Sequence, residues 1–194
     1  MPLTWFADIV AVRDYSDNVY ITYIGYTSKP PPHPWNILFQ KSLDGGESWS
    51  DPVIVSGNIS ADKNWMCVNP DIPTEIYVTF NSQYPFASAS VDGGETWKEP
   101  VLLEALEGSY FFAGGGGVRP ADGAVFFAYS AIPAGGGGEE EWEEEESYYS
   151  YDQGFDKSNS TANFTYARVY ASFDQGEWEL VGMDVVGVLC LRCM

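Results

Sequence analysis

Aromatic side chains stand next to polar and charged ones in several segments that separate the apolar runs of this chain. Such pairs suit sugar rings, because the apolar face of a ring stacks on an aromatic side chain while its hydroxyls form hydrogen bonds. An alternative fits equally well, in which the same aromatic side chains cap a hydrophobic core. The candidate binding residues are Lys29, His33, Trp35, Lys63, Asn64, Trp65 and Tyr84.

An internal repeat indicates which elements position these residues. Asp-Gly between runs rich in β-branched and aromatic residues predicts a hairpin turn, in which the Ser and Asp side chains hydrogen-bond the backbone of the turn itself. The Trp that follows is expected to pack against a neighbouring copy of the unit. The three copies are box 1 (Ser42-Leu-Asp44-Gly-Gly46-Glu-Ser-Trp49), box 2 (Ser90-Val-Asp92-Gly-Gly94-Glu-Thr-Trp97) and the shortened box 3 (Ser172-Phe-Asp174-Gln-Gly176-Glu-Trp178).

The S-x-D-x-G-x-x-W pattern resembles the Asp-box, or BNR repeat, of sialidases and sialidase-like β-propellers. The resemblance implies an all-β arc of about three four-stranded antiparallel blades, a partial six-bladed propeller, with each box in the turn between the third and fourth strands. The 48 residues from Asp44 to Asp92 fit one blade of roughly 40 to 50 residues. A single partial domain over residues 1–194 is predicted, with blades at about 9–55, 64–104 and 110–181, an acidic insert at 133–165 and a tail at 182–194.

Composition agrees with an all-β protein and limits the partners. Aromatic residues make up 16% of the chain, and long windows of helical periodicity are absent. The net charge is −19, with seven glutamates between residues 139 and 146, so nucleic acids and anionic membranes are not expected as partners. No stretch approaches the roughly 20 apolar residues of a membrane span. The first residues lack the pattern of a signal peptide, whereas the resemblance implies a secreted or extracellular protein.

The resemblance also implies where a substrate site lies and what it contains. In the family the site is on the face away from the boxes, which here assigns the loops at about 26–36, 57–65, 81–86 and 104–110. The family binds a substrate carboxylate with three arginines and uses an Asp acid/base and a Tyr nucleophile, and Asp62 and Tyr84 are the weak candidates for those two roles. None of the four arginines of this chain lies in the loops assigned to the site. Arg13 and Arg119 fall at turns on the box face, Arg168 lies in a strand and Arg192 in the tail.

These observations predict a sialidase-like propeller that recognises a glycan or glycoprotein and is non-catalytic or incomplete as this chain. The alternative is an exo-sialidase-type glycoside hydrolase whose missing catalytic residues come from further sequence or from a partner chain. Three blades do not close a propeller, which needs about 4 to 8, so either a homodimer completes a six-bladed ring or the chain is part of a longer one. The pair Cys190 and Cys193 is only half of a zinc site, and neither a metal nor a cofactor is expected.

Overall fold

The computed structural model describes residues 3–27, 35–103, 105, 109–119, 124–133, 165–174 and 177–186, and every regular element in these ranges is a β-strand. The fold is therefore all-β, as predicted. The strands are β1 (Leu3–Arg13), β2 (Val19–Thr27), β3 (Asn36–Ser42), β4 (Val53–Ile54), β5 (Asp62–Val68), β6 (Ile76–Asn81), β7 (Pro85–Ser90), β8 (Val101–Leu102), β9 (Ser109–Val118), β10 (Val125–Pro133), β11 (Thr165–Asp174) and β12 (Glu177–Val186).

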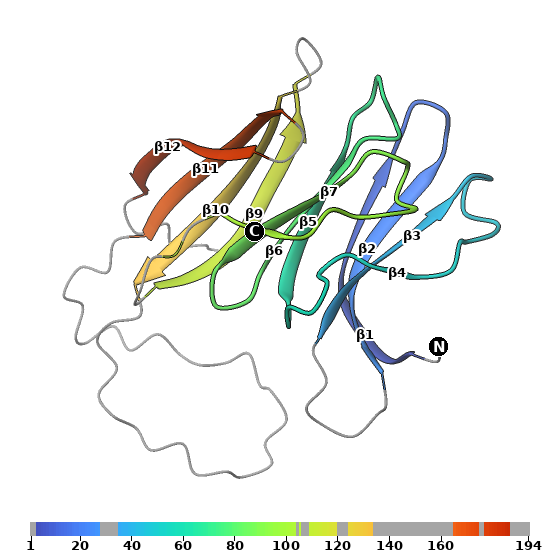
Figure 1. Ribbon diagram of the computed structural model, residues 1–194, viewed down its shortest axis with the longest axis horizontal. Coiled ribbons are helices and arrows are strands. Elements are labelled where there is room, and N and C mark those ends of the chain that lie inside the picture. Colours follow the sequence, from blue (N-terminus) through green and yellow to red (C-terminus); the bar gives the residue numbers. More distant parts are fainter. Residues whose placement is uncertain are drawn as a thin grey trace, which may run out of the picture.

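The strands form three four-stranded antiparallel sheets, each a meander of strands that are neighbours in the sequence. Sheet 1 has the order β1-β2-β3-β4, sheet 2 the order β5-β6-β7-β8 and sheet 3 the order β9-β10-β11-β12. Figure 1 shows the sheets side by side in chain order, as the successive blades of an arc that does not close. The prediction of an arc of about three four-stranded antiparallel blades is confirmed.

The ends of the sheets differ in places from the predicted ranges. β1 begins at Leu3, so the expected start of the first blade at residue 9 falls inside this strand. β12 extends to Val186 and pairs with β11, which makes the first residues of the predicted tail part of sheet 3. The acidic insert between β10 and β11 lies outside the described residues.

Two hydrophobic clusters hold the sheets together, one on each face of sheet 2. The first cluster joins Phe39 and Ile24 of sheet 1 to residues such as Val78 and Phe80 of sheet 2, and the second joins Tyr77 of sheet 2 to sheet 3. β6 is buried along its whole length because both faces of its sheet are covered. Alternation along the strands supplies apolar residues to both clusters.

The up-and-down order of strands sorts the connections into two groups at opposite ends of the sheets. The β1–β2, β3–β4, β5–β6 and β7–β8 connections lie at one end, called the box end because boxes 1 and 2 form the β3–β4 and β7–β8 turns. The β2–β3, β4–β5 and β6–β7 connections lie at the other end, called the opposite end. In the part of the chain that the structure describes, no helix is long and apolar enough to cross a membrane.

Candidate functional site

Boxes 1 and 2 have the same internal hydrogen bonds. In box 1 the Ser42 hydroxyl donates to Asp44 Oδ1 at 2.7 Å and accepts from the Gly46 amide at 2.7 Å. In box 2 the matching distances, from Ser90 to Asp92 and from the Gly94 amide to Ser90, are 2.7 and 2.8 Å. The Ser and Asp side chains thus satisfy the donors of their own turns, as expected for a structural role.

A hydroxyl four residues after each Asp completes the box, at a position that the S-x-D-x-G-x-x-W pattern leaves unspecified. Ser48 donates its hydroxyl to Asp44 Oδ2 and its amide to Oδ1, and Thr96 does the same for Asp92. These hydroxyl bonds, followed by the backbone bonds, lower the pKa of both aspartates to about 2. Both carboxylates are therefore charged acceptors at neutral pH and have no proton to exchange.

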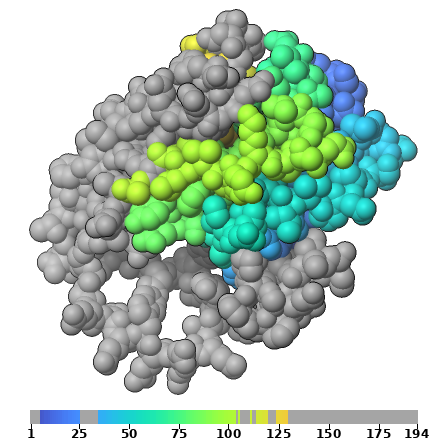
Figure 2. All heavy atoms as spheres, in the orientation of Figure 1, coloured from blue at the N-terminus to red at the C-terminus, as the bar shows by residue number. Residues whose placement is uncertain are grey.

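The two boxes differ in what they contact. The Trp97 ring of box 2 meets the Phe39 ring of sheet 1 edge to face, with the ring centroids 5.3 Å apart, and it packs against the first cluster. The expected packing of the box Trp on a neighbouring unit is confirmed here. Trp49 of box 1 remains 40% exposed. In Figure 2 the cyan segment of the chain, which includes box 1, lies at the right-hand edge of the molecule.

In box 3 the residues at 175–176, which include Gly176, lie outside the described residues. The structure gives only the backbone positions of the other members. Ser172 and Asp174 are in β11, and Trp178 is in β12.

At the opposite end an ion pair joins the inner strands of sheets 1 and 2. Lys63 Nζ lies 2.8 Å from Asp8 Oδ2, and each side chain is about one-third exposed. Asp8 and Lys63 both have positive φ, 50° and 42°, and each sits at an irregularity in the pairing of its strand. Bulges and left-handed residues of this kind concentrate beside functional sites, where they redirect a side chain.

Asn64 is an anchor between the sheets, not a loop residue that faces solvent. It is 6% exposed, accepts a hydrogen bond from the Thr22 hydroxyl at 2.6 Å and donates to the Asp8 carbonyl at 2.7 Å. The sequence predicts a loop over residues 57–65, whereas β5 begins at Asp62. Thr22 and Asp8 were not among the predicted residues. The sequence feature that marks Asp8 is a single carboxylate within the otherwise apolar run of residues 5–12.

Two of the candidate aromatic residues cap the core. Trp65 and Tyr84 are partly buried and pack against the second cluster. The Tyr84 hydroxyl accepts a hydrogen bond from Gln83 at 3.3 Å. For these two side chains the structure supports core capping, the alternative that the sequence left open.

Trp35 and Asp62 are the exposed candidates at the opposite end. Trp35 is 41% exposed, and its backbone is tied to the β4–β5 connection by bonds to the Ser60 hydroxyl at 3.3 Å and from the Ala61 amide at 2.7 Å. Ala61 directly precedes Asp62, which is exposed and accepts a hydrogen bond from the Lys63 amide at 2.8 Å. An aromatic side chain, a carboxylate and the Lys63–Asp8 pair thus lie near one another on adjoining segments.

The last candidates are the acid/base and nucleophile pair, Asp62 and Tyr84, and the loop residues Lys29 and His33. Asp62 pairs with Asn81 across sheet 2, which brings it to the same end of the sheet as Tyr84, but no hydrogen bond between the two side chains is present. Lys29 and His33 lie outside the described residues. Within the described ranges, no three His, Cys, Asp or Glu side chains gather closely enough to hold a metal ion.

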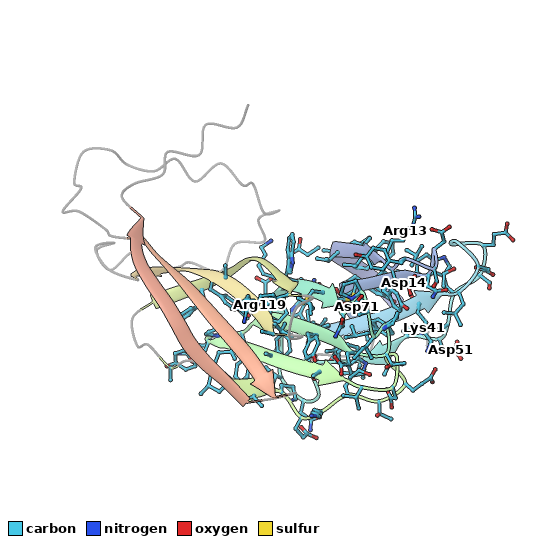
Figure 3. All side chains as sticks on the ribbon, turned by 90° about the horizontal axis from the view of Figure 1, so that it is seen from above. Arg13, Asp14, Lys41, Asp51, Asp71 and Arg119 are labelled. Atoms are coloured by element: carbon cyan, nitrogen blue, oxygen red, sulfur yellow. The ribbon has the colours of Figure 1, made fainter. Side chains whose placement is uncertain are left out.

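Arg13 and Arg119 lie at the box end, as predicted, and are engaged there. Arg13 ends β1 and pairs with Asp17, and Arg119 follows β9 with its guanidinium 5.3 Å from the centre of the Phe126 ring. Figure 3 shows the two arginines well apart, with Arg13 beside Asp14. Neither supplies a guanidinium to the end that carries Trp35.

Solved structures with a similar fold include a sialidase and a glycosyl hydrolase. The chain aligns over 92% of its length with 37% of the Hadza microbial sialidase Hz136, at a TM-score of 0.59 and 17% sequence identity. It aligns over 90% of its length with 50% of a glycosyl hydrolase from Bacteroides ovatus, at a TM-score of 0.52 and 10% identity. The chain thus spans half or less of these proteins. No protein-family model and no curated protein sequence matches it.

These similarities establish the class of fold. The protein is an all-β chain of propeller-like blades, and its arrangement of sheets is that of a sialidase-like structure. At identities below 20% the likeness concerns the fold and assigns no activity.

Proposed function

We propose that this chain recognises a glycan or glycoprotein through the opposite end of its blades, without hydrolysing it on its own. The observation that carries the proposal is the exposed ring of Trp35 beside the segment that bears Asp62 and the Lys63–Asp8 ion pair. The fold similarity to a sialidase and a glycosyl hydrolase supports a glycan as the ligand class.

The chemistry of these groups fits a sugar. An exposed indole offers an apolar face for a pyranose ring, and a carboxylate accepts hydrogen bonds from the vicinal hydroxyls. The Lys63 ammonium is paired with Asp8, so together they offer hydrogen-bonding groups without a net charge. The net charge of −19 disfavours a nucleic acid or an anionic membrane as the ligand, and sugar binding of this kind needs no cofactor. The proposal implies a protein that acts outside the cell, where glycans are displayed.

A glycan array tests the proposal directly. The full chain is expected to bind a restricted set of sugars, and Trp35→Ala should lower that binding at least tenfold while leaving the thermal melting curve nearly unchanged. Tyr15→Ala is the matched control, because Tyr15 is an 80% exposed aromatic residue in the β1–β2 turn at the box end. Absence of binding to every sugar, or equal losses in the two variants, would count against the proposal.

A sialidase-type hydrolase is the second candidate, and one observation favours it. Asp62 and Tyr84 lie at the same end of sheet 2, as an acid/base and a nucleophile of one site would. The arginines would then come from further sequence or from a partner chain. Release of a fluorophore from a sialic acid conjugate, with Asp62→Asn and Tyr84→Phe as the inactive variants, separates this candidate from binding alone. Turnover above that of heat-killed protein is expected only if the hydrolase proposal holds.

A further inference from the structure

The side chain of Asn81, the last residue of β6, is buried, and its carbonyl oxygen has no hydrogen-bond partner among the described residues. Asn81 is 6% exposed, and the unpaired atom is Oδ1. An unpaired buried acceptor costs free energy, because it has lost its hydrogen bonds to water and gained none in the protein. Trp97 Nε1 is also buried and unpaired, but the large apolar ring of Trp97 accounts for its burial. Asn81 brings little apolar surface, so its burial needs another reason.

The other two asparagines among the buried residues are hydrogen-bonded. Asn64 joins sheet 2 to sheet 1. Asn69, which is 3% exposed and follows β5 at the box end, donates from Nδ2 to Glu75 Oε2 at 2.8 Å and accepts from the Asp71 amide at 3.1 Å. Both side chains thus have structural partners. Asn81 is the exception, a buried carboxamide at the opposite end whose acceptor is unused.

Alternation along β6 gives the direction of the Asn81 side chain. Val78 and Phe80 belong to the first cluster and Tyr77 to the second, so Asn81 points to the side of sheet 2 that faces sheet 3. Its partner in β5 is Asp62. Directly paired residues of antiparallel strands carry their side chains on one face, with Cβ atoms about 4.5–5.5 Å apart. Since Asp62 is exposed, this Asp62–Asn81 pair has one member in solvent and the other buried beside it.

Two aromatic rings lie on the same side of sheet 2 as the Asp62–Asn81 pair. Trp65 and Tyr84 pack against the second cluster, and both are half-buried. Trp65 pairs with Thr79, two residues before Asn81, and Tyr84 is in the short turn that joins β6 to β7. Partly exposed rings beside a carboxylate and a carboxamide fit a sugar, which presents both apolar ring faces and hydroxyls.

The charges around the Asp62–Asn81 pair favour a neutral sugar. Asp62 is negative and exposed, and the ammonium of the next residue, Lys63, is paired with Asp8 at 2.8 Å. A carboxylate on the ligand would be repelled by Asp62. Two neighbouring hydroxyls, in contrast, can each donate a hydrogen bond, one to the carboxylate and one to the carboxamide oxygen.

We propose that the Asp62–Asn81 pair binds neighbouring hydroxyls of a neutral sugar unit, which supplies the donor that Asn81 Oδ1 lacks. This inference rests on the proposed glycan recognition and deepens it by naming a further binding residue and the class of sugar. The pair adjoins the Trp35 segment, because the amide of Ala61, directly before Asp62, bonds the Trp35 carbonyl at 2.7 Å. Asn81 is then a residue kept for binding at a cost in stability.

Replacing Asn81 by leucine separates binding from structure. Leucine is similar in size to asparagine and has no hydrogen-bonding groups, so Asn81→Leu should leave the melting temperature unchanged or raise it. The probes are a printed array of neutral oligosaccharides and their sialylated forms. Isothermal titration of the full chain then uses the neutral member that the wild-type chain binds most tightly. Its dissociation constant should rise about tenfold or more in Asn81→Leu.

Asn69→Leu is the matched control, because Asn69 is buried to a similar degree but is hydrogen-bonded and lies at the box end. It should lower the melting temperature and leave the dissociation constant unchanged. The two asparagines are thus expected to give opposite results. A fall in the melting temperature of folded Asn81→Leu like that of Asn69→Leu, or an unchanged dissociation constant, overturns the proposal.

Asp62 provides a second test at an exposed position, which decides the matter if Asn81→Leu does not fold. Asp62→Asn keeps an acceptor oxygen and removes the charge. Neutral oligosaccharides should therefore bind within about threefold of the wild-type affinity, and the sialylated forms, which the wild-type chain binds more weakly, should gain affinity. Asp62→Ala should weaken the binding of neutral members about tenfold or more. A wild-type preference for the sialylated forms, or no gain for them in Asp62→Asn, refutes the assignment of a neutral sugar.

The outcomes also separate this inference from the proposed function. A loss of binding in Trp35→Ala without a loss in Asn81→Leu or Asp62→Ala refutes the Asp62–Asn81 pair and leaves glycan recognition in place. A wild-type chain that binds no member of the array refutes both.

Discussion

Box 1 and box 2 are nearly the same turn in two different surroundings. Their hydrogen bonds agree to within about 0.1 Å, and the pKa of the central aspartate is about 2 in both. Box 2 nevertheless rests on Phe39 and Lys41 of the preceding sheet, whereas box 1 leaves its Trp 40% exposed. The box therefore forms from its own residues, and its contribution to packing depends on whether a strand of another sheet lies against it.

The largest difference is expected for the two tryptophans, measured by urea unfolding of dilute, monomeric protein. Trp97→Ala removes a ring packed on Phe39 and the first cluster and should lower the free energy of unfolding by about 3 kcal/mol. Trp49→Ala, at a more exposed position, should lower it by about 1 kcal/mol. Equal losses would mean that the Trp of box 1 is packed as tightly as that of box 2, which would contradict the difference between the two boxes.

The glycines come next. Gly94→Ala combines the strain of a positive φ of 85° with a clash against the Phe39 ring, for a total of about 2–4 kcal/mol. Gly46→Ala meets only the Trp49 ring, at a contact distance of 4.0 Å, so it should cost only the strain of its φ of 100°, about 1–2 kcal/mol. The double variants Phe39→Ala with Gly94→Ala and Phe39→Ala with Gly46→Ala provide the check. Without the Phe39 ring, the free-energy cost of Gly94→Ala should fall because the clash is gone. The cost of Gly46→Ala should be the same with and without that ring.

The aspartates should behave alike in the two boxes, because their hydrogen bonds come from within the turn. Each folded pKa of about 2 lies below the ordinary value of 3.8, so the stabilisation is fully present above about pH 4 and is lost as the pH falls towards 2. NMR titration should give similar pKa values for Asp44 and Asp92. Asp44→Asn and Asp92→Asn should each remove a similar part of the acid dependence of stability, and a large inequality would show that docking affects the carboxylate.

The smallest effect is expected at Lys41. Its ammonium donates to the Gly93 carbonyl at 2.9 Å and to Glu95 at 2.6 Å, but the Glu95 side chain is mostly exposed. Lys41→Met should therefore lower the free energy of unfolding by about 0.5 kcal/mol, and less in high salt. A loss as large as that of Trp97→Ala would assign the docking of box 2 to charge and not to ring packing.

The features predictable from the sequence were those determined by residues close together in the chain. The box turns follow from Ser, Asp and Gly within eight residues, and the meander of strands follows because each sheet uses consecutive segments. The Lys63–Asp8 pair joins residues 55 apart and depends on how sheet 2 sits on sheet 1 and on irregularities in both inner strands.

Burial of candidate polar side chains was also beyond the sequence. Asn64 has the residue type of an exposed loop, yet it is buried because β5 begins at Asp62 and turns its side chain towards Thr22 of the preceding sheet. Tyr84 and Trp65 could not be assigned to ligand or core by type alone, since both roles use the same apolar surface.

The order of strands within each sheet also bears on how such a molecule arises and folds. Since every sheet is a run of consecutive strands, each sheet can form its hairpins before the next sheet is formed. The free energy of unfolding then approximates the sum of one contribution from each sheet and one from each contact between neighbouring sheets. A duplicated 48-residue stretch brings its own turn and its own Trp, and needs only an apolar strand beside it. Adding a blade by duplication therefore leaves the contacts between existing blades unchanged. In an open arc, only an end blade has a sheet face without a neighbouring blade.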